Sequence, residues 1–396
     1  MGEEPPGPAT TGLYLHVPYC AALCSYCDFF RVVSGEGAPA WFETALETEA
    51  ALYREGPPVV LDSVYFGGGT PSLLGPGRIG GLCDALRALF AWSREAEVTL
   101  EANPETVTAE ALAGWREAGV NRLSLGVQSL QAPELEALGR RAAPDQARRA
   151  VELAASAGFP RLSVDLLLGV PGQTGESLAR TLDEVEAMPL DHLSAYMLDL
   201  HRGTTLHARV LAGETFLPGG DAVADLYDLL CDRLAAAGFE HYEISNFARP
   251  GGRSRHNLRY WRGEEYIGLG PSAHGCFRGV RTENPRSVER WRRALERGER
   301  PHERVSEVTA RERRENALIF GLRLSDGVPS TLLRGFLEEQ GREPGPVLEP
   351  LLRHGYAELK GADRFRLTRL GFLCSNEVLG FLLPRGWSET TVRQGR

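Results

Sequence analysis

The sequence of 396 residues has no uninterrupted apolar run of about 18 residues, the length that a membrane-spanning helix requires. It opens on MGEEPPGPATT, which is acidic and proline-rich and has no apolar core of the kind found in signal peptides. Pro6 stands where an N-myristoylation site needs serine or threonine. We therefore expect a cytoplasmic protein with no transmembrane segment, and we leave peripheral contact with a membrane open.

Lysine is almost absent, because Lys360 is the only lysine and every other basic residue is an arginine. The 44 basic residues are outnumbered by 53 acidic ones, which gives a formal net charge of −9. A protein whose main role is to bind phosphate backbones is expected to carry a positive balance. We therefore expect no nucleic-acid partner.

The seven cysteines are an odd number, in a chain too large to need disulfide bonds for stability. Three of them, Cys20, Cys24 and Cys27, form the pattern C-x3-C-x2-C. Three thiolates can each bind one iron of a cubane cluster and leave the fourth iron open for chemistry. The alternative is a structural zinc site, with His16 or Asp28 as fourth ligand, although no second pair of close cysteines follows.

Short apolar runs alternate with segments whose apolar residues lie three and four positions apart. The runs are Leu13–Val17, Val59–Phe66, Val98–Glu101, Arg122–Val127, Leu162–Leu168 and His192–Leu198. The helical segments between them are Trp41–Arg54, Ile79–Trp92, Ala109–Ala118, Asp145–Ala157 and Ser177–Met188. Strands that alternate with helices predict parallel βαβ units. The expected fold is therefore an α/β protein with a partial TIM-like (β/α)6 barrel.

Unusual residues follow these predicted strands. The cysteines follow the first run, GGGTP the second, EANP the third, GVQS the fourth and GVPGQT the fifth. Barrel enzymes carry their chemistry at this end of the strands. Glu101 and Asp165 lie in otherwise apolar strands, so each should have a cationic or hydroxyl partner.

The pattern changes beyond the sixth run. We expect a disordered N-terminus over residues 1–11, a barrel with an extension over 12–285, a connector helix over 286–305 and a tail over 385–396. The pattern over residues 306–384 predicts helices followed by a small hairpin, an arrangement typical of a winged-helix-like domain. Winged helices often bind DNA, but this segment carries no clustered basic face.

The motifs together resemble a known family. The segments YLHVPYCAALCSYCDF, YFGGGTPSLL, LEANPE, RLSLGVQSL, LGRRAAP, DLLLGVPGQT, HLSAYML, YEISNFARPG, RHNLRYW and GLGPSAHG look like those of the coproporphyrinogen-oxidase-like group of radical S-adenosylmethionine (SAM) proteins. The resemblance extends over roughly residues 12–380. In that family the amino acid end of SAM chelates the open iron of a 4Fe-4S cluster, and one electron cleaves SAM to a 5′-deoxyadenosyl radical.

The resemblance also implies which residues bind these cofactors. It places the cluster on Cys20, Cys24 and Cys27. It places SAM contacts on residues that follow or end the predicted strands, namely Tyr14, Tyr26, Gly68, Gly69, Thr70, Glu101, Gln128, Arg140 and Asp165. The chain departs from the family at Ala142, where a histidine is often found.

Two sister types share this pattern. Oxygen-independent coproporphyrinogen III oxidases carry a fourth nearby cysteine and a long N-terminal extension. Here Phe29 holds that position and 19 residues precede Cys20. The haem chaperones of the HemW type carry phenylalanine there and an H-N-x-x-Y-W motif, which residues 256–261 supply. The chain therefore resembles that type more closely.

This resemblance implies a protein that binds haem and passes it to apo-haemoproteins, with an electron donor that the sequence does not identify. His256 is the candidate haem ligand, because it lies in a polar and aromatic segment, and His241, His274 and Cys276 are weaker options. A radical decarboxylase of coproporphyrinogen III, which would be an oxidoreductase, is the alternative, and a zinc-stabilised DNA-binding regulator is a remote one. No side chain is singled out as catalytic, and whether the chain is an enzyme stays open.

Overall fold

The computed structural model describes residues 10–35, 37–361 and 363–383. Most of the N-terminal segment and all of the tail that we expected to be disordered lie outside these ranges. Thr10 and Thr11 differ from the expectation, because they begin strand β1 (Thr10–Val17) and pair with strand β4 (Val60–Gly68). No helix in the described ranges is long and apolar enough to cross a membrane.

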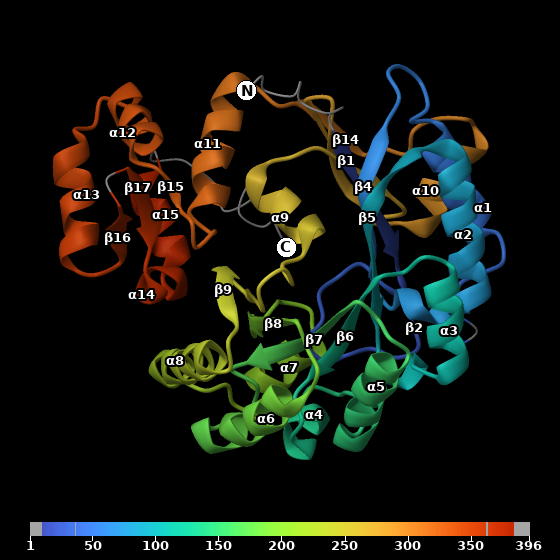
Figure 1. Ribbon diagram of the computed structural model, residues 1–396, viewed down its shortest axis with the longest axis horizontal. Helices are drawn as coiled ribbons and strands as arrows, with labels where there is room; N and C mark the ends of the chain where they lie inside the picture. Colours follow the sequence, from blue (N-terminus) through green and yellow to red (C-terminus); the bar gives the residue numbers. More distant parts are fainter. Residues whose placement is uncertain (1–9, 36, 362, 384–396) are drawn as a thin grey trace.

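Six parallel strands form the centre of the molecule, as the sequence predicts (Figure 1). They follow one another in chain order, each paired with the next: β1, β4, β5 (Ala91–Ala102), β6 (Arg122–Gln128), β7 (Arg161–Leu168) and β8 (His192–Met197). The helices cover the outer face of the sheet: α1 (Phe42–Ala51), α2 (Gly75–Leu89), α3 (Ala109–Glu117), α5 (Pro144–Ser156), α6 (Gly175–Ala187) and α8 (Gly220–Ala236).

The alternation of side chains along β1 shows how the barrel divides its two faces. Leu13, Leu15 and Val17 are fully buried in the core between the sheet and the helices. Tyr14 and His16 point to the opposite, inner face, since successive side chains of a strand alternate. Each fully buried aliphatic side chain contributes about 1.5–3 kcal/mol to folding. The core between the sheet and the helices therefore stabilises the fold. The inner face of the sheet is available for polar and aromatic groups.

One predicted boundary is wrong. The helix expected over 79–92 ends at Leu89, and β5 begins two residues later, so Trp92 lies in a strand and pairs with Leu61. The helical spacing of apolar residues runs on into Trp92, but Phe90 has an extended backbone that directs the chain into the sheet. Pairing with β4 overrides the local pattern.

The sheet continues beyond the six predicted strands on both sides. Strand β11 (Tyr266–Leu269) pairs parallel with β1, and β12 (His274–Phe277), β13 (Val280–Glu283) and β14 (Arg304–Glu307) follow it in antiparallel order. On the other side, β10 (Asn246–Ala248) pairs with β8, and β9 (Glu240–Glu243) forms the edge. The connector helix expected over 286–305 is shorter than predicted, because α10 spans Val288–Glu296. The last two residues of the predicted range, 304 and 305, lie in β14.

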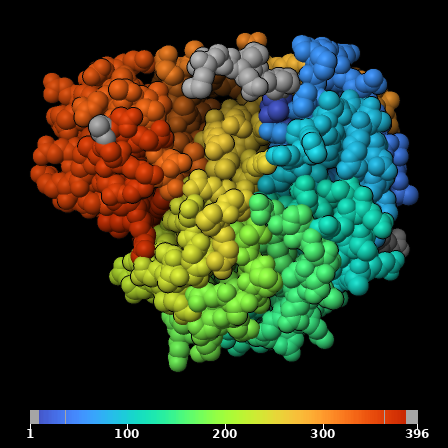
Figure 2. All heavy atoms as spheres, in the orientation of Figure 1, coloured from blue at the N-terminus to red at the C-terminus, as the bar shows by residue number. Residues whose placement is uncertain are grey.

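The C-terminal segment has a hydrophobic core of its own, around Ile319, Leu337 and Phe365. Its elements are α11 (Ala310–Gly321), β15 (Val328–Pro329), α12 (Ser330–Glu339), α13 (Pro344–Arg353), β16 (Ala357–Lys360), β17 (Arg364–Leu367), α14 (Arg369–Leu373) and α15 (Ser375–Leu382). Helices beside the small sheet β15-β17-β16 are compatible with the winged-helix-like domain that we expected. This unit lies beside the segment that contains helix α9 (Arg255–Arg262) (Figure 2). The Phe320 ring packs edge-on against the Trp261 ring, with centroids 6.2 Å apart.

Candidate functional site

The three clustered cysteines lie on one loop directly after β1. Residues 18–31 form this cysteine loop, and a short parallel pair, β2 (Tyr19–Cys20) with β3 (Val32–Val33), closes its base. Backbone hydrogen bonds from Val32 N to Pro18 O (2.7 Å) and from Ser34 N to Cys20 O (3.0 Å) hold the two ends together. Cys20 is buried, and the other two cysteines are partly exposed.

The thiols of this loop lie close enough to influence one another. Burial raises the pKa of the Cys20 and Cys27 thiols, and the charge of Cys24 raises both further. Thr70 Oγ1 donates to Cys20 Sγ (3.6 Å), and Arg140 Nη1 donates to Cys24 Sγ (3.5 Å). A raised pKa disfavours the thiolate forms of Cys20 and Cys27, and the positive charge of cluster iron would favour them.

Three cysteine thiols on one loop are a donor set that fits an iron–sulfur cluster. In the described part of the chain, no three His, Cys, Asp or Glu side chains converge on one point as they would around one metal ion. A cubane does not require its three thiolates to converge on one point, because each thiolate binds a separate iron. His16, one candidate fourth ligand for zinc, has both ring nitrogens engaged, with Tyr14 Oη (3.0 Å) and with Phe30 O (3.0 Å).

The triple-glycine turn packs directly against the base of the cysteine loop. Gly69 N donates to Val17 O (2.8 Å), and Thr70 N donates to Tyr19 O (2.9 Å). A Cβ on Gly69 would lie 2.8 Å from the carbonyl of Pro18 and 2.9 Å from Cys20 Sγ, so a larger residue would force these atoms to shift. Gly68 has φ of +114°, which only glycine adopts readily. The thiols and the glycines therefore share one rim of the barrel.

Two half-buried carboxyl groups face the interior near this rim. Glu101 Oε1 accepts from Tyr65 Oη (2.7 Å) and Oε2 accepts from Gly68 N (3.2 Å), while Asp165 Oδ1 accepts from Ser124 Oγ (3.0 Å). The prediction of hydroxyl partners is thus confirmed. Burial raises the pKa of Glu101 to about 7 and that of Asp165 to about 6, although these hydrogen bonds favour the charged forms.

Arg140 connects the cysteine loop to the ends of neighbouring strands. Besides its bond to Cys24, its Nη2 donates to Asn103 Oδ1 (3.0 Å) and to Gly126 O (2.7 Å). Its buried Nε has no hydrogen-bond partner within the described residues. A guanidinium with one unused buried N–H beside the thiols is suited to bind a carboxylate.

The remaining predicted contacts lie around the same rim. Gln128 ends β6 with φ of +68°, a conformation that costs a non-glycine residue about 1–3 kcal/mol and that often marks a functional site. Tyr26 packs against a small cluster that contains Leu138 and Val170. Ala142, at the position where the family often has histidine, is buried and offers no polar group.

Sequence reasoning missed several residues that complete the site. Asn103 accepts from Arg140, and its Nδ2 donates to Thr70 Oγ1 (3.3 Å), so it joins the arginine to the glycine turn. Tyr65 and Ser124 supply the hydroxyl groups for the two carboxyls. The signal for Asn103 was available, because it lies in the EANP segment two residues after Glu101. The other two were hidden, since tyrosine and serine in a strand are unremarkable.

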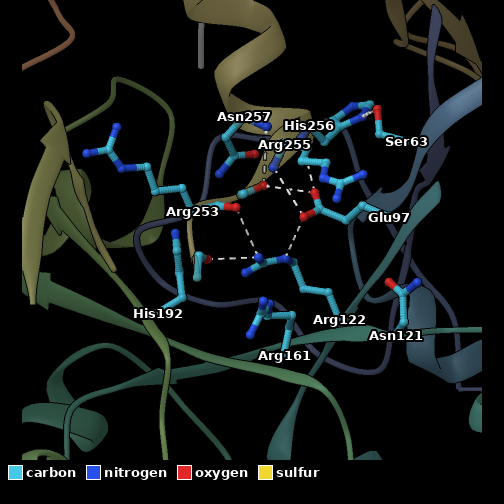
Figure 3. Close-up of polar contacts among 12 residues, drawn as sticks. Ser63, Glu97, Asn121, Arg122, Arg161, His192, Arg253, Arg255, His256 and Asn257 are labelled. Atoms are coloured by element: carbon cyan, nitrogen blue, oxygen red, sulfur yellow. Dashed lines mark hydrogen bonds and ion pairs between the residues drawn. The ribbon is translucent and has the colours of Figure 1, made fainter. Parts of the chain in front are cut away.

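His256 lies on helix α9, and its fully buried side chain lies beside Ser63 (Figure 3). Its Nδ1 is hydrogen-bonded to Ser63 Oγ (3.0 Å) and its Nε2 to Tyr260 Oη (2.8 Å). Burial lowers the pKa of His256 to about 3, so the ring is neutral. To bind haem iron, the ring would first have to lose one of these two bonds.

The weaker haem candidates are also partly enclosed. His241 lies in β9 and stacks on Phe247 with ring centres 4.2 Å apart. His274 and Cys276 lie in β12, at the far side of β11 from the cysteine loop strand β1. Burial lowers the pKa of both imidazoles and raises that of the Cys276 thiol.

Comparisons with known proteins agree with this geometry. The Radical SAM superfamily profile matches residues 14–185. The chain is 37% identical over 377 residues to the heme chaperone HemW of Mycobacterium tuberculosis, with 94% of each chain covered. It is 34% identical to HemW of Bacillus subtilis, with 93% of this chain and 98% of that one covered.

A solved structure shows the same fold. Coproporphyrinogen III oxidase (HemN) from Escherichia coli, described as a radical SAM enzyme, superimposes with a TM-score of 0.81 at 23% sequence identity. The match covers 95% of this chain and 90% of that one, so the likeness includes the C-terminal unit as well as the barrel.

Proposed function

Because this chain belongs to the radical SAM superfamily, and within it to the family of its HemW relatives, we propose that it is a haem chaperone. In this proposal it carries a 4Fe-4S cluster and SAM, binds haem, and delivers the haem to apo-haemoproteins of the cytoplasm. The observation that carries the proposal is the contact between the cysteine loop and the triple-glycine turn, in a chain that matches its HemW relative from Mycobacterium tuberculosis over 94% of its length.

The residues on the rim would share the binding of the two cofactors. Cys20, Cys24 and Cys27 would hold the cluster, which supplies an open iron and an electron when bound. The free Nε of Arg140 would donate to the carboxylate of SAM, and the backbone of the glycine turn would approach its amino group. Glu101 and Asp165 would accept from ammonium or ribose hydroxyl groups. Tyr14, Tyr26, Thr70 and Gln128 would complete the pocket.

Exposed apolar side chains near the rim support haem as the cargo. Leu23 and Phe29 on the cysteine loop are 48% and 54% exposed. Tyr196 and Met197, at the end of β8, are 42% and 36% exposed. A flat aromatic ligand gains free energy by covering such groups. The proposal does not specify the haem ligand, the recipient proteins or the electron donor.

Haem titration of the reconstituted protein tests the proposed function. After anaerobic loading, we expect about four irons and four sulfides per chain, and zinc without sulfide would instead support a metal-stabilised regulator. Addition of haem should then give a saturable absorption change, measured with and without SAM. Conversion of coproporphyrinogen III to protoporphyrinogen, without retention of haem, would show that the decarboxylase alternative is correct.

The two carboxyls, Glu101 and Asp165, give SAM binding an expected pH dependence. As pH falls through about 7 and then about 6, first Glu101 and then Asp165 takes up a proton and becomes neutral. A neutral carboxyl attracts a cationic ligand less, so the affinity for SAM should fall with decreasing pH, by up to about tenfold per pH unit for each proton. Calorimetry between about pH 8 and pH 5.5 measures this effect. Glu101→Gln should remove the upper inflection, and a flat profile in the unmodified protein contradicts the assignment.

A further inference from the structure

Helix α9 is fixed at its N-terminal end by a buried ion pair from two barrel strands (Figure 3). Glu97 of β5 accepts from His256 N (3.0 Å) through Oε1 and from Arg255 N (3.2 Å) through Oε2. Arg122, the first residue of β6, donates through Nε to Glu97 Oε2 (3.0 Å). Its Nη2 donates to Gly252 O (2.8 Å) in the segment that leads into the helix.

This ion pair is among the most enclosed charges in the molecule. Glu97 is 7% exposed and Arg122 is 3% exposed. Burying two charges is costly unless they are paired and their remaining hydrogen-bonding groups are used. Here the carboxylate meets the free N–H groups at the start of a helix, where negative charge is favoured. The pair therefore holds α9 in one position across the inner face of the sheet.

From α9, a continuous series of contacts reaches the rim. The His256 ring stacks on the Tyr65 ring, with centroids 5.0 Å apart and planes inclined by 26°. Tyr65 Oη donates to Glu101, and Glu101 accepts in turn from the backbone of Gly68. Ser63 and Tyr65 lie two apart on β4, so both point to the inner face. The imidazole of His256 thus packs against the Tyr65 ring, and the Tyr65 hydroxyl orients the Glu101 carboxyl of the SAM pocket.

We propose that His256 is a positioning residue for the SAM pocket, held in place by Glu97 and Arg122, and that it acts on Glu101 through Tyr65. This inference rests on the proposed function, because that proposal assigns the pocket. It gives the H-N-x-x-Y-W segment a role in SAM binding in place of haem ligation. The imidazole makes no contact with the ligand in this role, and its effect is on the orientation of the carboxyl.

The test measures SAM affinity and haem affinity on the same cluster-loaded, full-length variants. Tyr65→Phe keeps the ring and removes the hydroxyl that donates to Glu101, and His256→Ala removes the ring that stacks on Tyr65. We expect each to weaken SAM binding at least tenfold while iron content and haem affinity stay unchanged. The change that SAM causes in the paramagnetic resonance spectrum of the reduced cluster should diminish in parallel.

Tyr53→Phe is the matched control, because Tyr53 is buried and bonds to His302 (3.1 Å) on the outer side of the sheet. It should leave SAM binding unchanged. Glu97→Gln should weaken SAM binding in the same direction, and if that variant does not fold, the Tyr65 and His256 variants decide the matter.

The outcomes separate this inference from the proposed function. Loss of haem binding in His256→Ala with unchanged SAM affinity would establish the imidazole as the haem ligand and overturn the inference. Unchanged affinity for both ligands in both variants would overturn it as well. If the unmodified protein binds SAM but no haem, the proposed function fails, and the weakened SAM binding of the variants still supports the inference.

Discussion

A chain with Cys24 replaced by alanine is expected to lose its cluster almost completely. A cubane needs three thiolates to hold it here, and the Cys24 thiol is also the one that Arg140 contacts, at 3.5 Å. We expect iron to fall from about four to below about one per chain after reconstitution, and SAM binding to fall with it, because the open iron is part of the SAM site. Iron and sulfide analysis measures the first effect and equilibrium dialysis the second.

Cys374→Ala provides the comparison for this variant. Cys374 is partly exposed in the C-terminal unit, between α14 and α15, and should not affect cluster content. Equal loss of iron in the two variants would mean that the cysteines act through general stability. Full cluster content in Cys24→Ala would remove the basis for a three-thiolate site.

Replacement of Gly69 by alanine is expected to disturb the cysteine loop without replacing any cysteine. The new Cβ would lie 2.8 Å from backbone atoms of Pro18, which cannot move aside as a flexible side chain could. Overpacking of this kind costs about 1–3 kcal/mol. Because Cys20 Sγ lies 2.9 Å from the same Cβ, the strain falls on the cluster ligand, and cluster loading should drop together with the melting temperature.

Gly77→Ala is the matched control for this prediction. Gly77 lies in α2, and nothing is within 4 Å of its added Cβ. Alanine in place of glycine inside a helix is expected to stabilise the protein by about 0.5–1 kcal/mol. Normal cluster loading in Gly69→Ala would show that the glycine turn and the cysteine loop can separate. It would contradict the inference that their packing supports the cluster.

Local sequence patterns were sufficient to predict the barrel strands. Leu13, Leu15 and Val17 are typical of a strand that buries one face, and the glycine turn after β4 follows the position expected of a strand end. The strands that flank these six were not predictable in the same way. Strand β11 has only four residues and includes Gly268, so its apolar pattern is too short to distinguish from a turn.

The candidate site was predictable where the chemistry is unusual and hidden where it is ordinary. Three close cysteines and two charges in apolar strands are rare enough to be noticed in one sequence. Tyr65 and Asn103 are common residues whose importance depends on partners 36 and 33 positions away. The ring contacts of His256 also depend on long-range packing, so the sequence could identify its segment as unusual but could not indicate what it touches.

The parallel pairing of β1 with β11 affects the order in which the protein can be made. Gly12 pairs with Tyr266, so one edge of the first strand has no neighbour until two thirds of the polypeptide has left the ribosome. An open strand edge invites pairing with other chains, and distant contacts form slowly. The nascent chain therefore depends on protection from aggregation during translation, and iron delivered before residue 269 has been synthesised would meet a loop whose supporting strand is paired on one side only.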